Sequence, residues 1–110
     1  MKFKMNDHTW EIVEVGNDEI FDEYNKDVDT SDIVRLYSFV RYSDHKLFLN
    51  VNNCYYSQNR ALLHELMHIY IYEYCSWEMD FNEEIVCDLM SNSHDIIHNI
   101  VDKYWNGKIE

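Results

Sequence analysis

The chain has no proline and only two glycines among its 110 residues. Glycine-rich phosphate loops and the G-x-S-x-G turn of serine hydrolases need closely spaced glycines, so both are excluded. Connections must therefore depend mainly on Asn, Asp and Ser, whose side chains favour turns by bonding nearby backbone groups. With no linker, repeat or low-complexity stretch, residues 1–110 are expected to form a single domain.

Cysteine and long apolar runs are also scarce. Cys54, Cys75 and Cys87 are an odd, widely spaced set, which argues against a disulfide framework and favours buried thiols in a reducing compartment. No stretch approaches the roughly 18 apolar residues of a membrane span, and the amino terminus has no apolar signal-peptide region. We therefore expect a soluble, cytoplasmic protein with no membrane contact.

Positive charge is the third deficit. Nine Lys and Arg stand against 21 Asp and Glu, which gives a formal net charge of −12 at pH 7. Binding to nucleic-acid phosphates needs concentrated Lys and Arg, so a nucleic-acid partner is not expected. A basic protein partner is compatible with this charge, although acidic balances also serve solubility alone.

The expected order of elements is strand, helix, strands, helix, helix, which is an α+β arrangement. Residues 10–15 are rich in strand-forming types, and Asn17 or Asp18 is expected to cap a short helix that ends near Tyr24. Residues 27–32 are predicted to form a loop. Residues 33–42 and 46–51 are rich in β-branched and aromatic types, so we expect a hairpin with its turn at residues 43–45.

Two longer helices follow in the prediction. Ser57 is a plausible N-cap of the first helix. Asp80 and Glu83 resemble a capping box at the start of the second, which is expected to run to about Trp105.

The most informative segment is His64-Glu65-Leu66-Met67-His68. Residues four apart on a helix lie on one face, so both imidazoles can reach a single metal ion. Glu65 is turned about 100° from His64, which leaves its carboxylate beside the metal and free to take a proton from a water bound there. This H-E-x-x-H pattern is typical of zinc hydrolases.

The flanks of this motif strengthen the interpretation. From residue 61 to 72 only His64, Glu65 and His68 interrupt an apolar or aromatic run, so the helix is expected to be buried nearly all round. A buried carboxylate without a partner costs several kcal/mol (about 3 to 5), and a bound metal would meet that need. The alternative is an ordinary core helix with a hydrogen-bonded Glu–His pair.

A catalytic zinc ion usually has three protein ligands and an open position, so a third ligand is required. His64-Glu65-x-x-His68 followed by Glu84-x-x-x-Asp88 resembles the gluzincin metallopeptidases. The resemblance implies that Glu84 is the third zinc ligand and that Asp88 orients a zinc-bound imidazole. It also implies that Glu65 is the general base.

Among gluzincins, the short chain most resembles the ImmA/IrrE group, which is common in phages and mobile elements. Its pattern is Glu-x-x-Ala-Asn-x-Phe-Ala, and here Cys87 and Ser91 replace the alanines while Asp88 stands where Asn is frequent. The resemblance covers roughly residues 35 to 105. It implies a minimal zincin-like fold, with a small twisted sheet packed on the active-site helix and residues 47–49 as the edge strand that a peptide substrate lies along.

Glu83 is the alternative to Glu84, because neighbouring helical residues point about 100° apart and only one can face the metal. The main apolar arc of this helix is centred opposite Glu84, which by itself would leave Glu84 and Asp88 in solvent, and Glu83 lies nearer that arc. Small Cys87 and Ser91 flank Glu84 and would let the two helices approach closely. On this spacing and the family pattern we expect Glu84 to be the ligand.

A second H-acid-x-x-H pattern lies at His94-Asp95-Ile96-Ile97-His98. Asp is one methylene shorter than Glu and reaches a water on the metal less easily, and only Glu110 follows as a downstream Glu. We interpret this segment as the polar side of an amphipathic helix. A supporting role for His94 or His98, polarising the substrate carbonyl, is the other option.

The sequence thus predicts a zinc metalloendopeptidase in which His64, His68 and Glu84 bind the metal, with a protein or peptide substrate. By resemblance alone, that substrate could be a regulatory protein of a mobile element. The alternative is a catalytically silent zincin-like binding or regulatory protein. The sequence sets neither the oligomeric state nor the group that stabilises the transition state.

Overall fold

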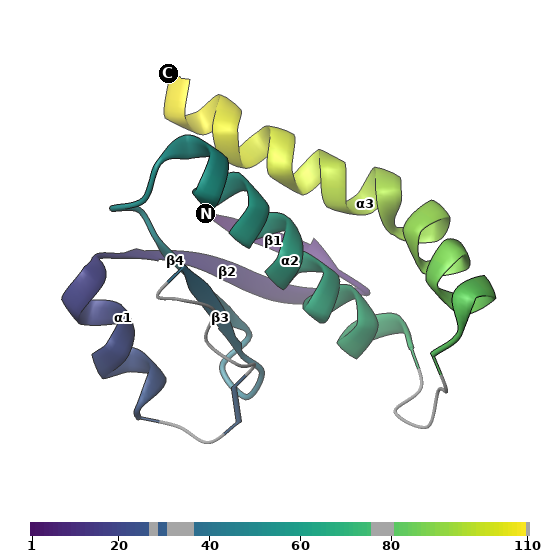
Figure 1. Cartoon of the computed structure of the whole chain (residues 1–110), viewed down its shortest axis with the longest axis horizontal. Helices are drawn as coiled ribbons and strands as arrows, with labels where there is room; N and C mark the ends of the chain where they lie inside the picture. Colours follow the sequence, from purple (N-terminus) through teal and green to yellow (C-terminus); the bar gives the residue numbers. More distant parts are fainter. Residues whose placement is uncertain (27–28, 31–36, 76–80, 110) are drawn as a thin grey trace.

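The computed structural model describes residues 1–26, 29–30, 37–75 and 81–109, which form an α+β domain with a four-stranded mixed sheet and three helices (Figure 1). In chain order the elements are β1 (Lys2–Met5), β2 (His8–Val15), α1 (Asn17–Tyr24), β3 (Ser38–Arg41), β4 (Lys46–Asn50), α2 (Tyr55–Tyr74) and α3 (Glu83–Ile109). The predicted α+β class is confirmed. None of the helices in these ranges is long and apolar enough to cross a membrane.

The strand order in the sheet is β1-β2-β4-β3. β1 pairs antiparallel with β2, β2 pairs parallel with β4, and β3 pairs antiparallel with β4. The predicted hairpin is confirmed for its described residues as β3 and β4, with a turn in which His45 has a φ of 54°. Residues 33–36 of its first predicted strand, and most of the predicted loop at 27–32, lie outside the described residues. Because β4 is paired on both sides, the expectation that residues 47–49 form an edge strand is wrong, and among the described strands the outer ones are β1 and β3.

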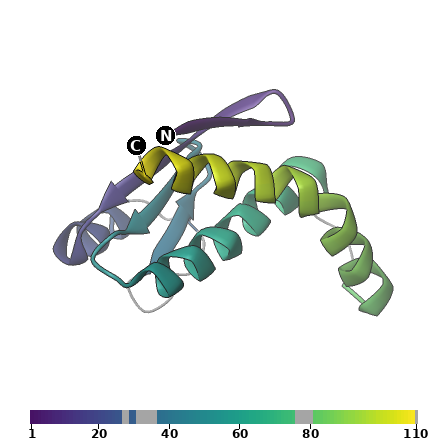
Figure 2. The ribbon, with the colours of Figure 1, turned by 90° about the horizontal axis from the view of Figure 1, so that it is seen from above.

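Both faces of the central strands are covered. Side chains alternate across a strand, so Leu47 and Leu49 point to one face and Phe48 points to the other. Phe48 packs with Phe39, Val15 and Ile20 beneath α1. Leu47 and Leu49 belong to the larger core beneath α2 and α3, and both helices lie on that face of the sheet (Figure 2).

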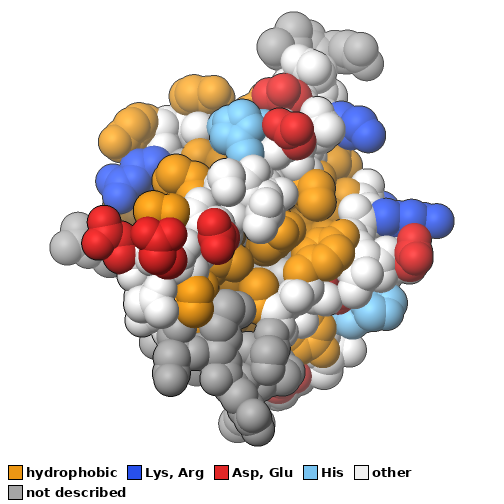
Figure 3. Space-filling view, turned by 90° about the vertical axis from the view of Figure 1, so that its right-hand side faces the viewer, with side chains coloured by type: hydrophobic (Ala, Val, Ile, Leu, Met, Phe, Trp, Pro, Cys, Tyr) orange, Lys and Arg blue, Asp and Glu red, His pale blue; other side chains and the backbone are white. Residues whose placement is uncertain are grey.

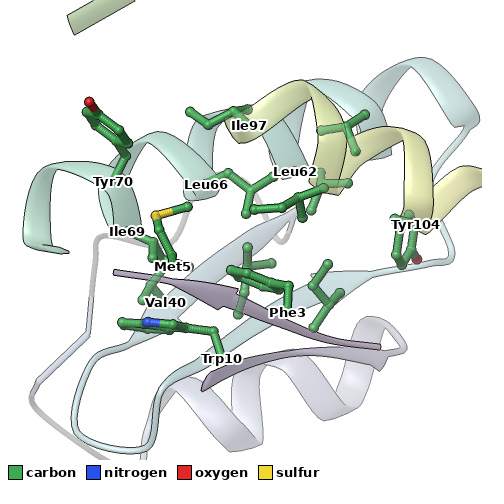
Figure 4. Packing of buried hydrophobic residues seen from close by; sticks show 14 of the residues in the cluster. Phe3, Met5, Trp10, Val40, Leu62, Leu66, Ile69, Tyr70, Ile97 and Tyr104 are labelled. Carbon is green, nitrogen blue, oxygen red and sulfur yellow. The ribbon is translucent and has the colours of Figure 1, made fainter. Parts of the chain in front are cut away.

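The larger core is where the elements distant in sequence meet (Figure 4). Leu62, Leu66 and Ile69 of α2 are fully buried over the sheet. Val40 of β3 and Trp10 of β2 lie below them, also fully buried. At about 25 cal/mol per Å² of apolar surface, this burial is the main stabilising term holding α2 against the sheet.

Helix starts differ from the predicted caps. Gly16, not Asn17 or Asp18, is the N-cap of α1, and an added Cβ there would lie 2.9 Å from Asn52 Oδ1. α2 begins at Tyr55 with Cys54 as its N-cap, so the expectation of a cap at Ser57 is wrong. Caps are set by local backbone geometry that several polar residues in a row can equally satisfy.

The second long helix, α3, begins at Glu83. Asn82 caps it, since its Oδ1 accepts a hydrogen bond from the backbone N–H of Ile85 at 3.0 Å. The predicted capping residue Asp80 lies outside the described residues. α3 continues to Ile109, beyond the predicted end at Trp105.

The three cysteines are unpaired thiols, as expected. Cys54 and Cys87 are exposed and Cys75 is half-buried, so the expectation of buried thiols is wrong. Burial raises the pKa of the Cys75 thiol, whereas hydrogen bonds with Ser57 lower the pKa of Cys54.

Candidate metal centre

Helix α2 gathers His64, Glu65 and His68 into one group. One ligand atom from each side chain lies within 4.8 Å of the others. Within the part of the chain that the structure describes, no other group of three or more His, Cys, Asp or Glu gathers so closely. The helical spacing that the sequence suggested is therefore realised by the side chains.

The two imidazoles have a separation suited to one metal ion. His64 Nε2 and His68 Nε2 lie 3.2 Å apart, and the ring planes meet at 73°. Tetrahedral zinc with Zn–N bonds of about 2.0–2.1 Å holds two ligand nitrogens about 3.3–3.4 Å apart. The same distance also allows one neutral imidazole to donate a hydrogen bond to the other. The geometry of the pair is therefore compatible with a metal-bound state and with a metal-free, hydrogen-bonded state.

Glu65 is fully buried between α2 and the sheet. The Ser38 hydroxyl on β3 donates a hydrogen bond to Glu65 Oε2 at 2.8 Å. A bond to an ionised acceptor is among the stronger hydrogen bonds in proteins, and it compensates part of the cost of burying the carboxylate. Ser38 was not identified from the sequence, because a single serine at the start of a short strand has no distinguishing pattern.

Tyr42, which follows β3, and Tyr72 of α2 form an aromatic pair. Their rings are stacked with centroids 4.9 Å apart. Burial, and then the charge of Glu65, raise the pKa of Tyr42 to about 12. The Tyr42 phenol therefore keeps its proton at neutral pH and can donate a hydrogen bond.

The predicted carboxylates of α3 are not part of the group. Glu83 and Glu84 are exposed in the first turn of α3, and Asp88 is exposed one turn later. The structure does not bring them together with the two imidazoles, so Glu84 as ligand and Asp88 as orienting residue stay predictions.

Small residues on α3 do not mediate the contact with α2. Cys87 and Ser91 are both exposed, so the expectation that they would let the helices approach closely is wrong. Leu89 and Ile97 are buried instead, because α3 turns its main apolar arc toward the core.

The second histidine pair lies on the exposed side of α3. The rings of His94 and His98 are stacked at 4.2 Å with an interplanar angle of 26°, and both residues are exposed. His94 Nδ1 lies 3.1 Å from the carboxylate of Asp95, whose side chain is 95% exposed. Their exposure fits the polar side of an amphipathic helix, and their place in the lining of the groove between α2 and α3 is compatible with a supporting role.

A groove of about 520 Å³ separates α2 from the amino-terminal half of α3. Hydrophobic side chains gather on the face of the molecule that carries the end of α2 and the start of α3, with acidic side chains beside them (Figure 3). The lining residues come from both helices: Leu63, Met67, Ile71, Phe81, Val86, Leu89, Met90, Ser93, His94, Ile97 and His98. Met67 and Ile71 are neighbours of His68 on α2, so the groove adjoins the candidate metal centre.

Comparisons with protein-family models, with curated proteins and with solved structures each gave no match to this chain.

Proposed function

We propose that this chain is a zinc-dependent metallopeptidase in which His64 and His68 bind the metal and Glu65 is the general base. The separation of 3.2 Å between the two Nε2 atoms carries the proposal, because it matches two ligands of one tetrahedral ion. The burial of Glu65 supports the proposal as well. On an ordinary surface helix, an acidic residue next to a histidine would be exposed to water.

Zinc at this position would supply Lewis acidity, which lowers the pKa of a bound water toward about 7 and polarises a carbonyl. With zinc held by His64 and His68, the Glu65 carboxylate would be the group that takes a proton from the attacking water and delivers it to the leaving amine. Ser38 holds the carboxylate in place through the 2.8 Å hydrogen bond. Tyr42 keeps its proton at neutral pH, because burial and the charge of Glu65 raise its pKa to about 12.

The third ligand in this proposal is Glu84, by resemblance to the gluzincin pattern, with Glu83 as the alternative. The side chains of both are exposed in the first turn of α3. Asp88 would orient one imidazole by hydrogen bonding to its other ring nitrogen.

The groove between α2 and α3 supports a peptide substrate with apolar side chains. Its lining is mostly aliphatic, and Met90 in its wall is 71% exposed. Concave apolar sites with a few polar groups at one end are typical of substrate clefts. The substrate proposed here is a protein segment that places apolar residues beside the scissile bond.

The test is Glu65→Gln, assayed for zinc by elemental analysis and for cleavage of a library of quenched fluorogenic peptides. Gln keeps the size and a hydrogen-bond acceptor for Ser38 but cannot accept a proton. We expect zinc content to be unchanged and kcat/KM to fall by at least about a hundredfold. Full activity in Glu65→Gln would remove Glu65 from the mechanism, and absence of zinc from the wild type would refute the proposed site.

The second candidate is a noncatalytic binding protein that uses the metal for stability. The observation that favours it is the position of Glu84, which lies outside the group around the imidazoles. Such a protein would bind zinc, lose stability sharply on chelation and cleave no peptide of the library. The same two assays, with a thermal melt in a chelator, therefore separate the two candidates.

A further inference from the structure

A second groove lies at the opposite edge of the sheet from Ser38 and Glu65. It has a volume of about 570 Å³ and runs between the edge strand β1 and α3, which lie beside each other (Figures 1 and 2). We call it the β1–α3 groove; Lys2, Phe3 and Lys4 line it from β1, and Ile96, Ile100 and Lys103 line it from α3.

The charge of the β1–α3 groove is opposite to that of the molecule. Three of its nine lining residues are lysines and none is acidic. The whole chain has 21 Asp and Glu against nine Lys and Arg. A cationic concavity on an anionic protein concentrates anionic ligands and repels other copies of the same surface.

The backbone of β1 offers hydrogen-bonding groups along the same groove. Met1 and Ile12 exchange both backbone hydrogen bonds, at 3.2 Å and 2.8 Å. Antiparallel pairs alternate between bonded and non-bonded positions, so the N–H and C=O groups of Lys2 and Lys4 point to the outer edge of the sheet. An extended segment placed there can pair with them as an additional strand.

The two faces of β1 specify the side chains of such a segment. Lys2 and Lys4 are exposed on one face, whereas Phe3 is buried on the other beside Ile100. A strand added to β1 would place alternate residues opposite the lysines and opposite the apolar floor. A second copy of β1 would instead bring lysines opposite lysines, which is destabilising.

We propose that the β1–α3 groove binds an extended acidic segment of a partner protein, in which acidic and apolar residues alternate. The segment adds a fifth strand at the edge of β1, pairs its carboxylates with Lys2, Lys4 and Lys103, and places its apolar side chains over Phe3 and Ile100. This surface is separate from the candidate metal centre and does not depend on zinc.

The probe is a capped hexapeptide of alternating Glu and Val, titrated into the full chain and followed by the backbone amide NMR signals. We expect saturable shifts at Lys2 and Lys4. N-methylation of the alternate peptide amides that face β1 should weaken binding by about tenfold, because the strand bonds are lost. A peptide of the same composition with its Glu and Val in two blocks should bind equally weakly.

Variants test the charge contribution. Lys4→Gln combined with Lys103→Gln should weaken binding by about tenfold, at about threefold for each exposed ion pair. Lys26→Gln is the matched control, because Lys26 lies on the far side of the sheet just after α1, where it pairs with Glu23. It should leave affinity unchanged.

Strand addition would be overturned if the N-methylated peptide, or the peptide with Glu and Val in two blocks, bound as tightly as the alternating peptide. Absence of binding at millimolar peptide would mean that the lysines only protect the edge from aggregation. Competition by a second copy of the chain, seen as a dimer in sedimentation, would also overturn the proposal.

Discussion

His64 and His68 on α2 and His94 and His98 on α3 have the same spacing, and an acidic residue follows the first histidine of each pair. On α2 the two Nε2 atoms lie 3.2 Å apart with the rings nearly perpendicular. On α3 the rings are stacked face to face at 4.2 Å. The first arrangement directs two nitrogens at one point, and the second does not.

The neighbouring acids differ even more. Glu65 is fully buried and accepts a hydrogen bond from Ser38, whereas the side chain of Asp95 is 95% exposed. The difference arises because α2 packs on β3 and β4, while His94 and His98 of α3 are exposed and line the groove between α2 and α3. A helical motif acquires its chemical environment from the element packed beneath it.

The largest expected difference between the two histidine pairs is in the zinc that each one holds. We expect about one zinc per wild-type chain and essentially none in His64→Ala, because one imidazole with Glu65 does not make a zinc site. His94→Ala should retain the full metal content. Elemental analysis of the two purified variants measures this, and equal loss of zinc in both would make the pairs equivalent.

The next largest effect is expected for the support beneath Glu65. Ser38→Ala removes the hydroxyl that bonds a buried carboxylate, so it should lower the free energy of unfolding by about 1–3 kcal/mol. Ser91→Ala is the control, since the Ser91 hydroxyl bonds only the exposed backbone carbonyl of Asp88. Urea unfolding of both apo variants gives the difference, and an unperturbed midpoint in Ser38→Ala would contradict the importance of this bond.

A smaller effect concerns alkaline pH. The pKa of Tyr42 is raised from about 10 to about 12, by burial and then by Glu65. The unfolded chain therefore releases this proton first, so stability is complete below about pH 10 and falls as the pH rises from there toward 12. Burial raises the pKa of Tyr104 and Tyr70 as well, so Tyr42→Phe should remove part of this slope.

Glu65→Gln should also reduce the alkaline slope, because it removes the negative charge near Tyr42. Asp95→Asn is the matched control and should leave it unchanged. Unfolding midpoints between pH 9 and about pH 12 provide the measurement. The same slope in wild type and Glu65→Gln would show that Glu65 does not contribute to the raised pKa of Tyr42.

The smallest effect is expected at the acid of the second pair. Asp95→Asn should leave the thermal unfolding midpoint of the wild type unchanged at neutral pH. An ion pair as exposed as His94–Asp95 contributes little, because water and salt screen it. A clear drop in the midpoint would mean that the second pair has a structural function that its exposure does not suggest.

Local patterns made part of the fold predictable. Helix α2 was predictable from the H-E-x-x-H motif within an apolar run, and the β3–β4 hairpin from β-branched and aromatic content, both of which are local features of the sequence. β1 was missed because four residues with two lysines make a weak strand signal. The assignment of residues 47–49 to an edge failed because β2, more than 30 residues earlier, pairs with β4 in parallel.

The candidate site was predictable to the same extent. His64, Glu65 and His68 belong to one helix, so their grouping followed from helical geometry alone. Glu84 and Asp88 were assigned by resemblance, and their approach to α2 depends on how two helices pack, which a helical projection does not specify.

The amino-acid sequence by itself determined that His64 and His68 share one face of a helix with Glu65 turned about 100° beside them, because the rise and turn of an α-helix are fixed by the backbone. Only the tertiary structure decided that Glu65 is buried against Ser38 while Asp95 is left in water. Burial depends on which distant strand packs under a helix, and that pairing is selected by the whole core rather than by the helix itself.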